Sequence, residues 1–231
     1  MDYLIPPRPQ AAVPVAGSTG LFPVHRIYCV GRNYVEHAKE MGGTGREAPF
    51  FFMKPADAIV PVAPGKVGEM PYPSMTSNLH HEVELVLAIG KGGKDIREED
   101  ALSHIWGYAV GLDMTRRDLQ AEAKAQGRPW CTSKGFDFSA PIGAIHTADT
   151  VSGMEQASIR LDVNGVVRQD SDTGKLIWNL SEIIVCLSQL YTLQPGDLIY
   201  TGTPAGVAAV QRGDLLEASI AGLSDLKVKL V

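Results

Sequence analysis

Residues 80–90 read His80-His81-Glu82-Val83-Glu84-Leu85-Val86-Leu87-Ala88-Ile89-Gly90, an apolar run interrupted by two acids. This pattern predicts a β-strand, in which side chains at positions i and i+2 project to the same side. Glu82 and Glu84 then share one face of the strand. The opposite face, which we expect to line the hydrophobic core, carries Val83, Leu85, Leu87 and Ile89.

A third acid, Asp113, ends the next strand-like run, residues 105–113. Two neighbouring carboxylates repel each other, and beside a core they cannot both stay ionised unless a cation neutralises them. Three carboxylates with room for water suit a hard divalent cation, Mg²⁺ or Mn²⁺, which keeps coordination positions open for a substrate. The spacing alone also allows a second interpretation, in which Glu82 and Glu84 lie on a solvated strand face.

Length and composition restrict the classes of protein that this chain can be. With 231 residues, 45% hydrophobic and 20% charged, it fits one large globular domain. A net charge of −5 and the lack of basic stretches interleaved with aromatic residues argue against a nucleic-acid partner. No apolar run approaches the ~20 residues of a membrane-spanning helix. Three scattered cysteines without CxxC spacing argue against a disulfide framework or zinc site and favour a reducing cytoplasm.

The chain divides into a proline-rich arm, residues 1–20, and a single domain, residues 21–231. The arm lacks the basic region of a signal peptide, so we expect none. Short apolar segments between prolines and glycines predict strands at 22–30, 50–55, 158–164, 197–201, 214–220 and 226–231, with a hairpin turn at Asn164-Gly165. Helices are predicted at 115–126, at 33–41 with Asn33 as its cap, and at 181–193 with an apolar stripe of Ile183, Ile184, Leu187, Leu190 and Tyr191.

The predicted strands outnumber the predicted helices and do not alternate with them, which disfavours a doubly wound parallel sheet. We therefore expect an α/β protein of the α+β type. Its core would be a mixed, mainly antiparallel β-rich structure with a few covering helices.

Two polar side chains on the helix predicted at 33–41 form a candidate catalytic pair. His37 and Glu40 lie three residues apart and so share one face of the helix. A carboxylate beside an imidazole can orient it and stabilise its protonated form, which a general base that activates water requires. An ordinary surface pair has the same spacing and is the alternative. Arg32 precedes the pair and would lie near the same opening.

Further candidates follow Asp113 in the sequence. Arg117 and Gln120 share one side of the predicted helix while Arg116 points elsewhere, so Arg117 is the better candidate for contacting a ligand. Lys134 could stabilise developing negative charge, the alternative being a solvated loop lysine. The glycine-rich turn at residues 201–207 lacks the GK[ST] ending of a nucleotide-binding loop, but its hydroxyl and amide groups could hold an oxyanion.

Taken in order, these segments resemble the fumarylacetoacetate hydrolase family. The matching stretches extend across residues 21–231 and are residues 28–34, 52–55, 81–85, 111–118, 130–141 and 195–206. Without the SH3-like N-terminal domain of longer animal members, the chain resembles the compact single-domain branch. Within that branch, residues 21–24, 113–118 and 127–130 are most similar to bacterial fumarylpyruvate hydrolases of gentisate breakdown.

The resemblance implies a role for each candidate residue. Metal ligands would be Glu82, Glu84 and Asp113, a lid would carry His37 and Glu40, and Lys134 would be the active-site lysine. Substrate contacts would come from Arg32, Lys54, Arg117, Gln120 and Thr203.

The implied reaction is metal-dependent hydrolysis of a C–C bond in a small-molecule 3,5-diketo acid, fumarylpyruvate, to fumarate and pyruvate. The cation would be Mg²⁺ or Mn²⁺ and the protein a homodimer. Decarboxylation or tautomerisation of oxaloacetate, and hydrolysis of another acylpyruvate, remain alternatives. A non-catalytic dicarboxylate-binding protein is a further alternative, against which the presence of both His37 and Glu40 argues.

Overall fold

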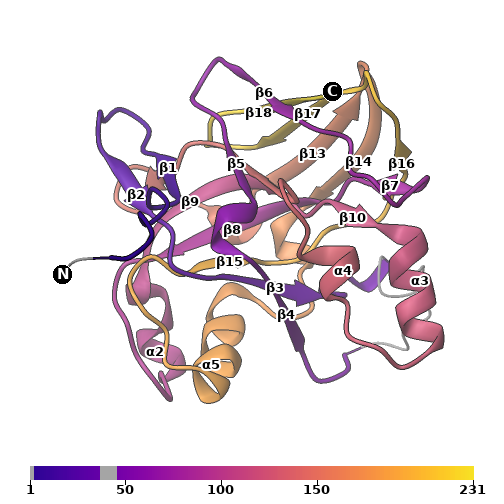
Figure 1. The fold of residues 1–231 in the computed structure, drawn as a ribbon. Coiled ribbons are helices and arrows are strands. Elements are labelled where there is room, and N and C mark those ends of the chain that lie inside the picture. The colour runs from indigo at the N-terminus through magenta and orange to yellow at the C-terminus, as the bar shows by residue number, and fades with distance from the viewer. Residues whose placement is uncertain (1–2, 37–45) are drawn as a thin grey trace.

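Two sheets make up most of the computed structural model, which describes residues 3–36 and 46–231 (Figure 1). The larger sheet has the strand order β4-β3-β15-β8-β9-β11-β5, and β12 pairs with β9 beside this path. Its strands are β3 (Ile27–Gly31), β4 (Phe50–Lys54), β5 (Ile59–Pro61), β8 (Val83–Ile89), β9 (Ile105–Leu112), β11 (Ala140–Ile142), β12 (His146–Thr147) and β15 (Leu198–Tyr200).

The second sheet has five strands in the order β14-β13-β17-β18-β6. They are β6 (Val67–Met70), β13 (Ser158–Val163), β14 (Val166–Asp172), β17 (Leu215–Ile220) and β18 (Leu226–Leu230). Two small sheets complete the strands of the described residues. One joins β7 (Leu79–His80) to β10 (Thr115–Arg116) and β16 (Ala209–Val210), and the other joins β1 (Ala12–Pro14) to β2 (Leu21–Pro23).

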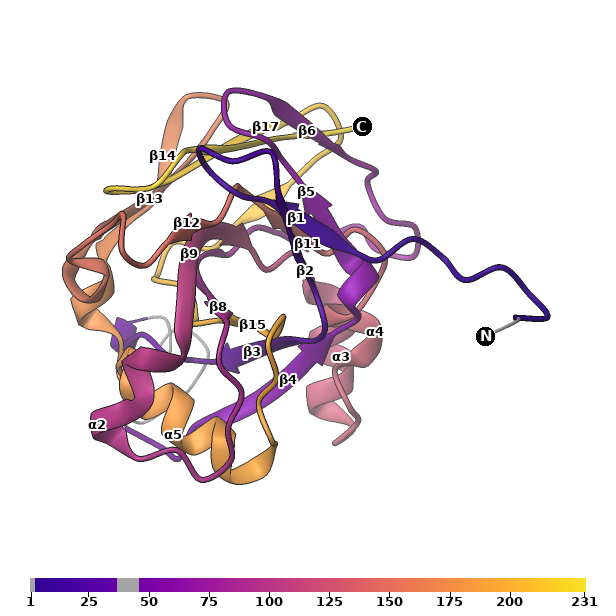
Figure 2. The same cartoon turned by 90° about the vertical axis from the view of Figure 1, so that its left-hand side faces the viewer.

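The helices of the described residues are short and lie at the periphery (Figures 1 and 2). Beyond residue 46, the α-helices are α2 (Glu98–Ala101), α3 (Arg117–Ala125), α4 (Cys131–Lys134) and α5 (Leu180–Leu190), and the 3-10 helices are η1 (Ala56–Ala58), η2 (Leu102–His104), η3 (Met154–Gln156) and η4 (Thr173–Lys175). No helix in this part of the chain has the length and apolar character needed to cross a membrane.

The predicted fold class is confirmed. Parallel pairing is limited to β3 with β15, β5 with β11, and β6 with β18, while the remaining strand pairs of the described residues are antiparallel. The sheets are therefore mixed and mainly antiparallel. The predicted hairpin at Asn164-Gly165 joins β13 to β14, and both residues have the positive φ that such a turn requires.

Strand β8 runs through the middle of the larger sheet with hydrophobic core on both faces. Val83, Leu85, Leu87 and Ile89 pack into the core that reaches the five-stranded sheet and α5. On the other face, Val86 and Ala88 join a second cluster with residues of β1 and β2. Glu82 and Glu84 therefore stand at one end of a strand that is surrounded by apolar side chains, not on a solvated face.

Several element boundaries differ from the predictions. The strand predicted at 22–30 is interrupted into β2 and β3, since the chain leaves β2 at Pro23. The helix predicted at 115–126 begins at Arg117, as α3, because Thr115 and Arg116 pair with β7. Helix α5 ends at Leu190, which is 63% exposed, so the apolar stripe is shorter than predicted.

Two segments near the N-terminus also differ from their predicted environment. Within the segment predicted as an arm, Val13 is fully buried and pairs with Phe22, so packing already begins there. Residues before it extend away from the sheets (Figure 2). The side-chain hydrogen bonds of Asn33 with described residues are not those of the predicted helix cap. Instead, its buried amide donates to the carbonyl oxygens of Trp178 and Thr201 and accepts from the Trp178 N–H.

Candidate metal centre and active-site cleft

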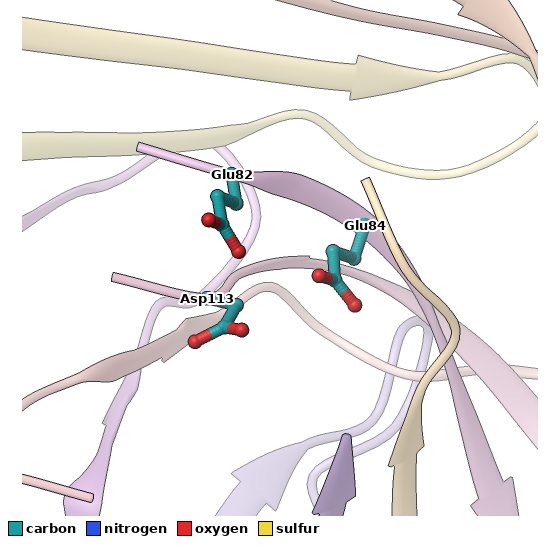
Figure 3. A group of neighbouring side chains, drawn as sticks. All are labelled: Glu82, Glu84 and Asp113. Carbon is teal, nitrogen blue, oxygen red and sulfur yellow. The ribbon is translucent and has the colours of Figure 1, made fainter. Parts of the chain in front are cut away.

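Three buried carboxylates meet where β8 and β9 lie side by side. Glu82 immediately precedes β8, Glu84 lies within it, and Asp113 immediately follows β9. The antiparallel register pairs Val83 with Leu112, which places Glu82 opposite Asp113, and the Asp113 N–H donates to the Glu82 carbonyl at 2.9 Å. One oxygen from each carboxylate lies within 4.8 Å of the others, and the side chains point toward one another (Figure 3).

Two glycines shape the space around Glu84. Gly111 is its cross-strand partner, and a Cβ there would come within 2.6 Å of the Tyr200 ring. The lack of a side chain at Gly111 thus lets Tyr200 pack beneath the carboxylates. Gly202 has a φ of +106°, a conformation that favours glycine, and its N–H donates to Glu84 Oε2 at 2.7 Å.

Three cations surround the carboxylates. The Lys134 ammonium donates to Glu82 Oε2 and to Asp113 Oδ2, each at 2.6 Å. Lys54 Nζ lies 2.8 Å from Asp113 Oδ1, and Arg117 donates to Glu82 Oε1. Burial opposes the charged form of Lys134, but the negative charges of Asp113 and Glu82 outweigh it, so the pKa of Lys134 is raised.

Glu84 differs from the other two carboxylates because, among the described residues, it makes no salt bridge. Its pKa is raised well above the ordinary value, first by burial and then by the charges of Asp113 and Glu82. A dication at the meeting point of the three carboxylates would remove this penalty. An all-oxygen donor set is also the one that Mg²⁺ and Mn²⁺ prefer. The residues therefore fit a hard divalent cation.

A narrow cleft, with a cavity volume of about 20 Å³, opens over the carboxylates. One wall is aromatic, formed by Phe52 and Trp130, whose ring centroids are 5.9 Å apart. The polar lining comes from the carboxylates and from Arg32, Arg117, Gln120, Lys134 and Thr203. The lining thus places hydrogen-bond donors on several sides of the three carboxylates, as binding of a small anion at a metal centre requires.

Most residues predicted from the sequence lie around this cleft, and Lys54 is an exception. Its side chain is fully buried, and its ammonium donates to the carbonyl oxygens of Met114 and Lys134 while facing Asp113. Lys54 is therefore absent from the cleft lining and stabilises Asp113 from behind. Its predicted contact with substrate does not fit this position.

Arg116 and Arg117 point in different directions, as the sequence interpretation expects. The Arg117 guanidinium lines the cleft, where it donates to Gln120 Oε1 at 2.5 Å. Arg116 instead lies over the Phe136 ring at 4.3 Å. Lys134 is buried at the end of α4 and is not a solvated loop lysine. His37 and Glu40 lie outside the described residues, so their pairing stays a prediction.

Gln169 is a residue of the site that sequence reasoning missed. This buried side chain in β14 accepts from the Val83 N–H at 3.1 Å and lies 3.0 Å from His81 Nδ1. Its amide nitrogen donates to the Thr203 hydroxyl at 2.8 Å. Gln169 therefore connects the start of β8 to the glycine-rich turn. The sequence signal for Gln169 is a single amide side chain in a strand whose adjacent residues are polar and exposed. This signal is weak unless the packing of the sheets is known.

Comparison with protein families gives one match over most of the chain. The family described as "Fumarylacetoacetate (FAA) hydrolase C-terminal" matches residues 26–231. This range includes β3 to β18 and every described residue that lines the cleft.

Similar proteins of known sequence or structure include fumarylpyruvate hydrolases and an oxaloacetate decarboxylase. A fumarylpyruvate hydrolase from Ralstonia sp is 47% identical over 79% of this chain and 92% of its own. A mitochondrial oxaloacetate decarboxylase from Dictyostelium discoideum is 39% identical over 89% of this chain and 94% of its own. The crystal structure of fumarylpyruvate hydrolase from Pseudomonas aeruginosa with Mn²⁺ and pyruvate is 53% identical, covers 100% of this chain and 99% of that one, and superposes with a TM-score of 0.98.

Proposed function

The chain belongs to the fumarylacetoacetate hydrolase family, and within this family we propose that it hydrolyses fumarylpyruvate to fumarate and pyruvate. The observation that carries the proposal is the cleft, in which three buried carboxylates face a lysine, an arginine and a glutamine. The likeness to the Pseudomonas aeruginosa enzyme, whose structure holds Mn²⁺ and pyruvate, supports both the cation and the keto acid.

The residues of the cleft account for the binding of a keto acid. When bound to Glu82, Glu84 and Asp113, a divalent cation supplies Lewis-acid polarisation of a carboxylate and its neighbouring keto oxygen. Arg117 and Gln120, one helical turn apart on α3, present N–H groups to the pyruvyl end of the substrate. The aromatic wall of Phe52 and Trp130 excludes water from the planar acyl chain.

Hydrolysis requires attack by water on the carbonyl carbon distal to the pyruvyl end. His37, oriented by Glu40, takes the proton from that water. The oxygen of the attacked carbonyl becomes an oxyanion, which the Lys134 ammonium and the Thr203 hydroxyl stabilise from the cleft wall. The C–C bond then breaks, its electron pair passes to the methylene carbon of the pyruvyl part, and protonation of that carbon yields pyruvate beside fumarate.

A second candidate function is decarboxylation or tautomerisation of oxaloacetate, which the Dictyostelium discoideum relative favours. Both reactions use the cation as an electron sink and need no activated water. A protein that binds dicarboxylates without catalysis is a third candidate, which the lysine buried among the metal ligands disfavours, because binding alone does not require it.

One panel of substrates tests these candidates. The purified protein is incubated with fumarylpyruvate, acetylpyruvate and oxaloacetate, each with Mg²⁺, with Mn²⁺ and with a chelator, and the products are identified by chromatography. We expect fumarylpyruvate to have the highest kcat/KM, with fumarate and pyruvate as the products. Decarboxylation or tautomerisation of oxaloacetate at a tenfold higher kcat/KM would replace hydrolysis as the function.

The same proposal extends to the setting of the enzyme. We place it as a Mg²⁺- or Mn²⁺-dependent homodimer in the cytoplasm, in the breakdown of aromatic compounds through gentisate. Support comes from the resemblance to bacterial fumarylpyruvate hydrolases and from cysteines that are all free among the described residues. Size-exclusion chromatography with light scattering measures the oligomer, and metal analysis of protein purified without added metal identifies the cation.

A further inference from the structure

Helix α3 carries a basic residue, Lys124, beyond the two residues of this helix that line the cleft. Arg117 and Gln120 both line the cleft, and Lys124 follows Arg117 by seven residues. At about 100° of rotation per residue, seven residues bring a side chain back to within roughly 20° of its starting direction. Lys124 therefore lies on the same side of α3 as Arg117, and a rise of about 1.5 Å per residue places it ~10 Å farther along the helix axis.

Two arginines, Arg32 and Arg117, act electrostatically on Lys124. Its ammonium is exposed and, among the described residues, forms no ion pair with a carboxylate. Partial burial lowers the pKa of Lys124, and the positive charges of Arg32 and Arg117 lower it further. Arg117 is already paired with Glu82, whereas Arg32 and Lys124 form no ion pair among the described residues, so an anion bound between these two cations would relieve their repulsion.

Arg32 approaches the same region from the turn after β3. It has a φ of +55°, an uncommon conformation for a residue with a side chain, and it lines the cleft. Its guanidinium lies over the Phe50 ring at 6.0 Å, and Phe50 packs edge-on against Trp130. The buried Nε of Arg32 has no hydrogen-bond partner in the described part of the chain. The backbone thus holds a guanidinium with an unused donor at the cleft.

The separation between Arg117 and Lys124 along α3 is comparable with the length of the proposed substrate. Fumarylpyruvate has seven carbons in a row, so its two carboxylates lie roughly 8 Å apart in an extended form, given C–C bonds of about 1.5 Å. This length is close to the distance along α3 between Arg117, beside Glu82, and Lys124. A substrate anchored at the metal centre would therefore bring its far carboxylate to the end of α3.

We propose that Arg32 and Lys124 form a subsite for the distal carboxylate of an acylpyruvate and so select dicarboxylic over monocarboxylic substrates. This inference rests on the proposed function, since it assumes that a keto acid occupies the metal centre. The subsite would bind the fumaryl carboxylate through two charge-assisted contacts and would leave the methyl group of acetylpyruvate without a partner.

The test compares substrate selectivity in wild type and three variants. Lys124→Met removes the charge and keeps most of the side-chain length, whereas Lys124→Arg keeps the charge. Lys66→Met is the matched control, because Lys66 is an exposed lysine in the loop between β5 and β6 and is not on α3. For each, kcat/KM is measured with fumarylpyruvate and with acetylpyruvate at low and high salt. Inhibition by fumarate and by crotonate, its analogue with a methyl group in place of one carboxylate, is measured alongside.

We expect Lys124→Met to lower the ratio of kcat/KM for fumarylpyruvate to that for acetylpyruvate about tenfold, the usual order for one charge-assisted contact. Lys124→Arg and Lys66→Met should keep the ratio within twofold of wild type. Added salt should reduce the wild-type ratio, since the contact is solvent-accessible. An unchanged ratio in Lys124→Met, or an equal loss on both substrates, would overturn the subsite.

The inhibition data separate this inference from the proposed function. If the wild-type protein hydrolyses neither substrate, the proposed function fails. The subsite then stands only if two conditions are met in calorimetry. Lys124→Met must weaken fumarate binding at least fivefold, and it must reduce the ratio of fumarate affinity to crotonate affinity by a similar factor. Equal binding of fumarate by wild type and Lys124→Met refutes the subsite whichever reaction the protein catalyses.

Discussion

Replacing Lys134 by methionine should make the metal-free protein less stable and its metal affinity higher. The Lys134 ammonium lies 2.6 Å from one oxygen of Glu82 and from one oxygen of Asp113, and all three side chains are buried. Removing one partner of a buried ion pair costs about 3–5 kcal/mol, because the remaining charges are left uncompensated. Lys54 and Arg117 still face the same carboxylates, so we expect a value near the lower end, about 3 kcal/mol.

A loss of this size is readily measured. For a chain of this length, 1 kcal/mol corresponds to a shift in Tm of about 2–4 °C, so Lys134→Met should melt roughly 6–12 °C below wild type in a chelator. The variant leaves more negative charge at the metal centre, and its Mn²⁺ affinity should rise at least tenfold. Cation at 100 times its Kd would then stabilise the fold by about 2.7 kcal/mol and offset most of the loss.

Circular dichroism melts in chelator and in Mn²⁺, together with calorimetric titration of Mn²⁺, measure both effects. Lys66→Met, which removes an exposed lysine, serves as the control and should change neither quantity. The reasoning is refuted if Lys134→Met has the same Tm as wild type in the chelator, or if its Mn²⁺ affinity is unchanged or lower. Its turnover should also fall by about 10²–10³, the usual loss when one donor to an oxyanion is removed.

Three further predictions address other parts of the site. Glu84→Gln should weaken Mn²⁺ binding at least tenfold in calorimetry yet remain folded, because an amide oxygen can still accept from the Gly202 N–H. Unchanged affinity would exclude Glu84 as a ligand. His37→Ala should lower kcat about 10²–10⁴-fold with Mn²⁺ affinity retained, and a near wild-type rate would remove His37 as the base. Gly111→Ala should destabilise by about 1–3 kcal/mol in urea denaturation, since its Cβ would meet Val86 and Tyr200; equal stability contradicts this packing.

The metal centre could be predicted from the sequence because it depends on local rules. Alternation along a strand places Glu82 and Glu84 on one face, and an antiparallel neighbour brings the end of the next strand, Asp113, opposite Glu82. The burial of these carboxylates could not be predicted in the same way. It depends on apolar side chains from both sides of β8, among them Val13, which the sequence pattern assigns to an arm.

Contacts between distant segments account for what the sequence interpretation missed. Gln169 reaches Thr203 and the start of β8 only because the five-stranded sheet packs against the larger one. Lys54 follows an apolar strand and precedes a proline, a position that is equally compatible with the cleft and with the core. Its side chain is directed to Asp113 by the pairing of β4 with β3, which alternation within β4 alone does not reveal.

On the proposed assignments, chemistry and substrate choice would reside in different parts of this fold. The carboxylates sit on β8 and β9, two central strands whose register is held by core on both faces, so a shift of either strand would expose apolar side chains. Arg32 and Lys124 lie instead on a turn and near the end of a short helix, where a substitution disturbs little packing. A related protein could therefore retain the three carboxylates that bind the metal and differ at the positions of Arg32 and Lys124. On this reasoning, removal of the positive charge at Lys124 should change which keto acid is the preferred substrate, while turnover of keto acids as such is retained.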